Sequence, residues 1–145
     1  MSKNYFEDEL RQALWSEIAG GRIRESAPSE QFFEKISRAF PASGSKIDWS
    51  RVPNSIQRCA SDEGDQLIIY AAFFDEIGRK FQLSGEVVYV GDSATDFSLT
   101  GELNFLRGAL PSIFSVPQHH YFIEPEAAWC MCFTMEGDMA FGFKP

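Results

Sequence analysis

The stretch HHYFIEPEAAWCMCFTMEGDMAFGF, residues 119–143, decides the fold of this chain. Three apolar runs within it, residues 119–124, 128–135 and 139–143, are separated by Glu124-Pro-Glu126 and Glu136-Gly-Asp138. Proline and glycine between short runs rich in aromatic side chains are typical of turns between β-strands. The second turn is short enough for a hairpin, so we expect consecutive antiparallel strands here.

The middle run indicates a strand that is buried on both faces. Successive side chains of a strand point to opposite faces, which places Trp129, Met131 and Phe133 on one face. Cys130 and Cys132 fall on the other face, and both sets are apolar, as is typical of a central strand. We expect the two cysteines to be small core residues, because their spacing does not favour a disulfide.

Helices are predicted upstream of these strands, where apolar residues recur at intervals of three and four. For residues 65–80 this spacing favours a helix, although Leu67-Ile-Ile-Tyr70 also fits a buried strand. A stripe of leucines predicts a helix that Pro111 ends. We expect helices over residues 4–19, 29–40, 53–60, 65–80 and 99–110, a loop over 41–46 and a strand over 86–90.

The order of these elements predicts an α+β fold. Helices come first and are followed by a strand, a helix and three strands, which is typical of helices packed on one face of an antiparallel sheet. We expect N-terminal helices packed on a mainly antiparallel sheet of about four strands formed by the C-terminal half. With 145 residues and 44% hydrophobic content, the chain is expected to form a single globular domain over residues 1–145.

Composition predicts a cytoplasmic protein. The longest near-continuous apolar run, Leu67 to Phe74, is too short to span a bilayer, so we expect no membrane association. The amino terminus lacks the basic and then apolar profile of an export signal. Three cysteines are an odd and low number, unlike the disulfide-stapled scaffolds of secreted domains.

Negative charge is concentrated in the C-terminal part of the chain. Residues 85–145 carry eight carboxylates against Arg107 and Lys144, whereas residues 1–84 carry 13 acids and 11 bases. Most of these eight acids flank strand-like runs, so we expect them at sheet ends and turns. Such a surface repels nucleic acid and attracts basic proteins, which makes a basic protein the expected partner.

Ser93 is the sharpest enzymatic candidate. Residues 87–96, VVYVGDSATD, run from a strand into Gly-Asp-Ser and resemble the first block of the GDSL-type esterases. That resemblance implies a serine nucleophile and a downstream Asp-x-x-His block, because the hydroxyl needs an imidazole oriented by a carboxylate. The histidines are His119 and His120, and the residues three before them are Val116 and Pro117. The block is therefore absent, and we expect no catalytic residue.

Other chemistries are not favoured either. Metal binding would need converging ligands, but the adjacent His119 and His120 point to opposite faces of a strand and the spacing matches no common zinc pattern. Glycine-rich phosphate loops are missing. We therefore expect no metal and no cofactor. Turn acids could still serve as paired carboxylates of a hydrolase if folding joined them in one cleft.

The acidic balance and the closing stretch, residues 117–143, resemble the small cytoplasmic immunity proteins of bacterial polymorphic toxin systems, including contact-dependent inhibition. The resemblance implies a non-catalytic protein that neutralises a cognate toxin, and many of these toxins are basic nucleases. Carboxylates that imitate phosphate would pair with the toxin's cations, with aromatic anchors beside them. The contact residues expected on this hypothesis are Asp92, Asp96, Glu124, Glu126, Glu136 and Asp138, with Tyr121 and Trp129 nearby if they are exposed.

Two other functions stay open. One is a small hydrolase that uses Ser93 or the turn carboxylates, and it would need a deep pocket with a strongly perturbed acid or histidine. The other is an adaptor or scaffold domain whose acidity serves solubility, with the acids dispersed over all faces. The sequence leaves open the identity of the partner, the oligomeric state and whether the acids form one patch.

Overall fold

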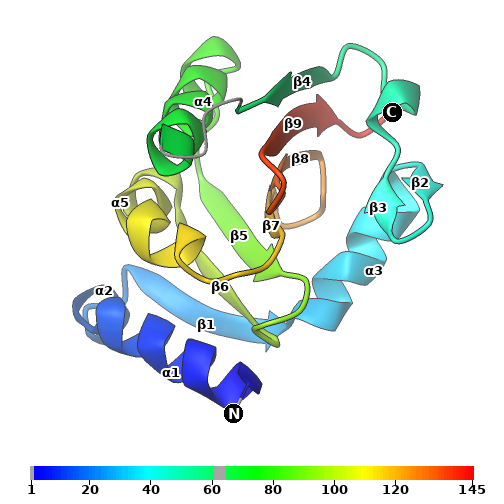
Figure 1. Ribbon diagram of the computed structural model, residues 1–145. Coiled ribbons are helices and arrows are strands. Elements are labelled where there is room, and N and C mark those ends of the chain that lie inside the picture. Colours follow the sequence, from blue (N-terminus) through cyan, green and yellow to red (C-terminus); the bar gives the residue numbers. More distant parts are fainter. Residues whose placement is uncertain (1, 61–64) are drawn as a thin grey trace.

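The computed structural model describes residues 2–60 and 65–145, and the side chains from residue 5 onward within them. A large antiparallel sheet forms its centre, and every strand is antiparallel to its neighbours (Figure 1). In spatial order its strands are β1 (Ile23–Pro28), β6 (Phe97–Glu102), β5 (Glu86–Gly91), β7 (His120–Ile123), β8 (Trp129–Phe133), β9 (Asp138–Phe143) and β4 (Ile56–Cys59).

Helices cover both faces of this sheet. On one face lie α1 (Ser2–Ala13), α2 (Trp15–Ala19), α4 (Gln66–Lys80) and α5 (Leu103–Phe114). On the other face lie α3 (Ser29–Ala39), the small hairpin of β2 (Ala42–Ser43) and β3 (Lys46–Ile47), and the 3-10 turn η1 (Trp49–Arg51). The sequence predicted helices packed on one face of the sheet. The layer of α3 and the β2–β3 hairpin on the other face corrects this prediction.

Aromatic rings dominate the core beneath α4 and α5. Phe133 of β8 has its ring centroid 4.9 Å from that of Phe114, 5.0 Å from Tyr70 and 5.9 Å from both Phe73 and Phe122. The pairs with Phe114, Phe73 and Phe122 are edge-to-face, an arrangement that stabilises a core beyond the area that the rings bury. The cluster ties β7 and β8 to both helices and so fixes these strands in place.

Several predictions are confirmed. The helix predicted over residues 65–80 is present as α4, and the strands of residues 86–91 and 120–143 lie close to their predicted bounds. Strand β8 has a neighbour on each side, with Trp129, Met131 and Phe133 in one core and Cys130 and Cys132 in the other. All of the cysteines are free thiols, and these two are buried.

The prediction of about four strands from the C-terminal half was wrong, because the sheet has seven strands in the described part of the chain and its two edge strands, β1 and β4, come from the N-terminal half. β4 occupies part of the segment predicted as a helix near 53–60. The loosely spaced apolar residues that suggested this helix serve opposite faces, since Val52 packs in one core and Ile56 against the other. The predicted loop at 41–46 contains β2 and the start of β3.

The helix predicted over residues 99–110 begins later and ends later. Leu99 belongs to strand β6, and its side chain packs in the same core as Leu106 and Leu110 of α5, so the three imitate a helical stripe. Pro111 lies inside α5 rather than ending it. The predicted helix over residues 4–19 is divided at Leu14 into α1 and α2.

Candidate functional site

Strand register brings four of the six predicted contact acids to one end of the sheet. Asp92 and Asp96 lie in the connection between β5 and β6, and Glu136 and Asp138 lie at the β8–β9 hairpin. Gly91 of β5 is opposite His120, His120 is opposite Phe133, and Phe133 is opposite Met139, so these ends are adjacent. We call Asp92, Asp96, Glu136 and Asp138 the acidic end.

The acidic end is the size of a protein-binding patch. All four of its acids are exposed. The outermost of these acids, Asp96 before β6 and Asp138 in β9, are separated by the four strand spacings from β6 to β9, which correspond to about 19 Å. This span fits within the roughly 800 Å² that each partner contributes to a standard protein interface.

The other two predicted acids lie at the opposite end of the strands. Glu124 accepts hydrogen bonds through Oε1 from the backbone N–H groups of Glu126 and Ala128, at 2.8 and 3.1 Å, and so caps the β7–β8 turn. Glu126 pairs with Lys35 of α3 at 3.1 Å. Both carboxylates therefore have local structural partners far from the acidic end.

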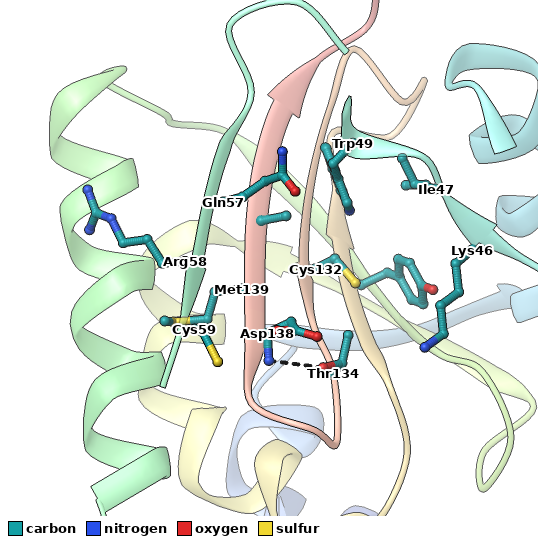
Figure 2. Close-up of a pocket in the computed structure, with 12 residues that line it drawn as sticks. Lys46, Ile47, Trp49, Gln57, Arg58, Cys59, Cys132, Thr134, Asp138 and Met139 are labelled. Atoms are coloured by element: carbon teal, nitrogen blue, oxygen red, sulfur yellow. Dashed lines mark hydrogen bonds between the residues drawn. The ribbon is translucent and has the colours of Figure 1, made fainter. Parts of the chain in front are cut away.

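A groove opens on the sheet face beside the acidic end. Two adjoining pockets of about 480 and 540 Å³ share Lys46, Ile47 and Tyr121. Figure 2 shows the first pocket, in which Lys46 and Trp49 face the sheet strands that carry Cys132 and Asp138. Asp92 and His119 line the second pocket, which is closed by Phe33 and Ile36 of α3 and by Phe40 directly after that helix. One acid of the acidic end thus lines each pocket.

Polar contacts join the groove to the acidic end. The Nζ atom of Lys46 lies 3.8 Å from Oε1 of Glu136, and Nε2 of His119 lies 4.0 Å from the same oxygen. His119 also accepts a hydrogen bond at Nδ1 from the backbone N–H of Met135, at 3.0 Å. Asp92 accepts one through Oδ1 from the backbone N–H of His119, at 3.0 Å. These contacts hold the two acidic loops on either side of His119.

A buried glutamine supports the loop that carries Asp92 and Asp96. Gln118 is 1% exposed, and its Oε1 accepts hydrogen bonds from the backbone N–H groups of Ser93, Ala94 and Thr95. Its Nε2 donates to Tyr89 Oη and Thr95 Oγ1, at 3.0 Å each. The carbonyl oxygen and the N–H₂ group of the amide are thus both engaged, and their hydrogen bonds tie the loop to the core.

The same network continues to His120. Tyr89 Oη lies 2.7 Å from Nδ1 of His120, and the two rings are stacked in the core. Burial lowers the pKa of His120 to about 3, with a smaller contribution from neighbouring His119. The imidazole is therefore neutral at physiological pH, and its Nδ1 can accept the Tyr89 proton. This arrangement is structural and leaves the ring away from solvent.

Tyr121 and Trp129, the two predicted aromatic anchors, are buried at 5% and 6% exposure. They pack in the two different cores, so they do not lie on one surface. Tyr121 nevertheless lines both pockets of the groove, where its ring packs edge-to-face on Phe33. Burial raises the pKa of Tyr121 and raises that of the neighbouring Cys132 thiol to about 12. Neither group is ionised at neutral pH, so the groove contains no thiolate from Cys132.

Ser93 is exposed, and its backbone rather than its side chain is engaged with Gln118. Within residues 5–60 and 65–145, no hydrogen bond links its hydroxyl to the ring of His119 or His120, whose Nδ1 atoms bond Met135 and Tyr89. The arrangement lacks the hydroxyl–imidazole contact that a serine nucleophile needs. The described part of the chain also contains no cluster of histidine, cysteine and acidic side chains arranged to hold a metal.

The groove wall at residues 46–49 was missed by sequence reasoning. Lys46 and Trp49 lie more than seventy residues before the strands that they face. No local sequence pattern indicates that residues so far apart along the chain are in contact.

None of the helices in the described residues is long and apolar enough to cross a bilayer. Comparisons with protein-family models, with curated proteins and with solved structures found no match.

Proposed function

We propose that this protein is a non-catalytic immunity protein, which binds and neutralises a basic toxin of the nuclease type in the cytoplasm. The observation that carries the proposal is the convergence of Asp92, Asp96, Glu136 and Asp138 at one end of the sheet. Exposed carboxylates from two separate loops form a surface that suits a basic partner.

Electrostatics supports a fast and selective encounter. The chain carries a net charge of −8, so its field attracts a basic protein and repels nucleic acid. A nuclease binds phosphate with Lys, Arg or His, and carboxylates at the acidic end would occupy those cations in place of the substrate. Inhibition by this route needs binding geometry and no reaction.

Rigidity of the acidic loops adds to this argument. Gln118 holds the segment from Ser93 to Thr95, and the backbone N–H of Asp96 donates to Oε2 of Glu7 in α1 at 2.7 Å. The backbone C=O of Asp96 accepts from the N–H of Ser29 in α3 at 2.8 Å. A surface that is already ordered loses less conformational entropy when it binds, and its affinity is correspondingly higher.

The test is capture followed by a growth assay. The tagged protein is used to isolate partners from the cells that produce it, and each captured protein is expressed alone and together with this chain. We expect a captured basic protein to arrest growth alone and growth to recover on co-expression. A captured set without any such protein, or hydrolase activity in the purified chain that depends on Ser93, would overturn the proposal.

A further inference from the structure

Strand β4 is a sheet edge with its outward backbone groups available. Within residues 2–60 and 65–145 its one partner strand is β9, with Cys59 opposite Asp138 and Ile56 opposite Phe141. The backbone N–H of Ala60 donates to the C=O of Gly137 at 2.7 Å, so these two residues are a hydrogen-bonded pair. Hydrogen-bonded pairs recur at every second residue of an antiparallel strand, so the backbone groups of Arg58 and Ile56 also form hydrogen bonds with β9. The N–H and C=O groups of Gln57 and Cys59 therefore point away from the sheet.

The opposite edge of the sheet, β1, is protected against pairing with another strand, and β4 lacks the same protection. Strand β1 ends in Pro28, has an irregular register between Ser26 and Pro28, and carries Arg24 and Glu25. Proline, irregular register and charge are devices by which proteins block pairing at an edge. In β4, Gln57, Arg58 and Cys59 are exposed, and the strand has neither proline nor an irregular register.

The charged side chain of β4, Arg58, does not block the pairing of another strand at this edge. The guanidinium of Arg58 donates to Glu76 of α4, with 2.7 Å between Nη2 and Oε2, and lies over the ring of Phe73. Figure 2 shows the side chain directed toward that helix. Because Arg58 is held on the helix face, four outward backbone groups of Gln57 and Cys59 remain as a template for another strand.

We infer that this edge accepts an extended segment of the basic partner as an additional antiparallel or parallel strand, an inference that rests on the proposed function. Gln57 and Cys59 line the first pocket with Asp138, so every second side chain of the added strand would face the groove. The added strand would lie two strand spacings, about 10 Å, from Asp138, within range of long basic side chains. Two copies of this chain, each with a net charge of −8, would repel one another at the same edge.

Amide hydrogen exchange measured by NMR tests the edge directly. The probes are a ten-residue peptide of alternating lysine and valine and a matched peptide of alternating glutamate and valine, each at 1 mM. We expect the basic peptide to slow exchange at Gln57 and Cys59 at least tenfold and to leave Arg58 unchanged. Unaltered exchange, equal slowing by both peptides, or slowing that depends on protein concentration without peptide would overturn the inference.

Variants of β4 separate this inference from the proposed function. Gln57→Pro removes an outward donor without touching the bonds to β9, and Gln57→Thr keeps that donor as the control. With the captured toxin, we expect Gln57→Pro to weaken binding at least tenfold and Gln57→Thr to bind normally. If both variants bind normally while neutralising the acidic end weakens binding about thirty-fold, the edge inference fails and the proposed function stands. If neither Gln57→Pro nor neutralising the acidic end affects binding, both the edge inference and the proposed function fail.

Discussion

The side-chain oxygen of Gln118 lies 2.8 Å from the backbone nitrogen of Ala94 and accepts its hydrogen bond inside the protein. The same oxygen accepts from Ser93 and Thr95, so one buried amide organises three consecutive residues between Asp92 and Asp96. The position of two carboxylates on the surface therefore depends on a residue that no partner can touch.

Gln118→Ala should both destabilise the protein and loosen the acidic loop. Three backbone N–H groups would lose their acceptor; that of Thr95 is buried, and those of Ser93 and Ala94 are partly buried. An unsatisfied buried donor costs about 1–3 kcal/mol, and less where water reaches it, so we expect a loss of about 2–4 kcal/mol. Urea unfolding measures it. Gln31→Ala on the exposed surface of α3 is the control and should change stability by less than about 0.5 kcal/mol. Equal effects of the two substitutions would contradict the role of Gln118.

Gly91→Ala should act through the same glutamine. A Cβ at Gly91 would overlap the amide of Gln118, which cannot move without breaking its own hydrogen bonds. We expect a loss of about 1–3 kcal/mol from this overpacking. Gly108→Ala in α5 meets no atom within 4 Å and should stabilise the helix by up to about 1 kcal/mol. Unfolding curves that show no difference between the two variants would refute the contact.

Stability should fall in acid because of His120. Its pKa is about 3 in the folded protein and near the ordinary 6.5 in the unfolded chain, so between these values the unfolded state binds the extra proton. The His120 contribution is thus fully present above pH 6.5 and is lost as pH falls toward 3, by up to about 1.4 kcal/mol per pH unit.

His120→Gln removes this titration. Between pH 7.5 and 5, the free energy of unfolding should fall less steeply for the variant than for the wild type, because the remaining acids are common to both. Parallel curves would show that the imidazole is not buried in its neutral form.

The parts of the fold that sequence could predict are those in which a local pattern and burial agree. Strand β8 is apolar on both faces, and α4 has its buried residues at helical spacing, so both were found. Edge strands β1 and β4 were missed because polar residues such as Arg24 and Gln57 leave no apolar alternation, and pairing with β6 and β9 determines their conformation. Leu99 misled the prediction because one core receives side chains from both a strand and a helix.

The candidate site was predictable in part for a similar reason. Turn positions of Asp92, Asp96, Glu136 and Asp138 follow from the strands that they flank, but their adjacency depends on the strand order β5-β7-β8-β9. Glu124 and Glu126 lie at turns as well, yet at the opposite end. The aromatic anchors were proposed for a surface, whereas Tyr121 and Trp129 are core residues because both strands are covered on both faces.

Titration of the captured toxin by calorimetry tests the central claim most directly, with two variants that remove the same amount of charge. One replaces the acidic end by amides (Asp92→Asn, Asp96→Asn, Glu136→Gln, Asp138→Asn), and the other replaces the acids of the opposite end (Glu86→Gln, Glu102→Gln, Glu124→Gln, Glu126→Gln). Four exposed ion pairs of about 0.5 kcal/mol each amount to about 2 kcal/mol, so the first variant should bind at least about thirty-fold more weakly. The second should bind within about threefold of the wild type, and equal losses of affinity in the two variants would contradict a specific acidic binding surface.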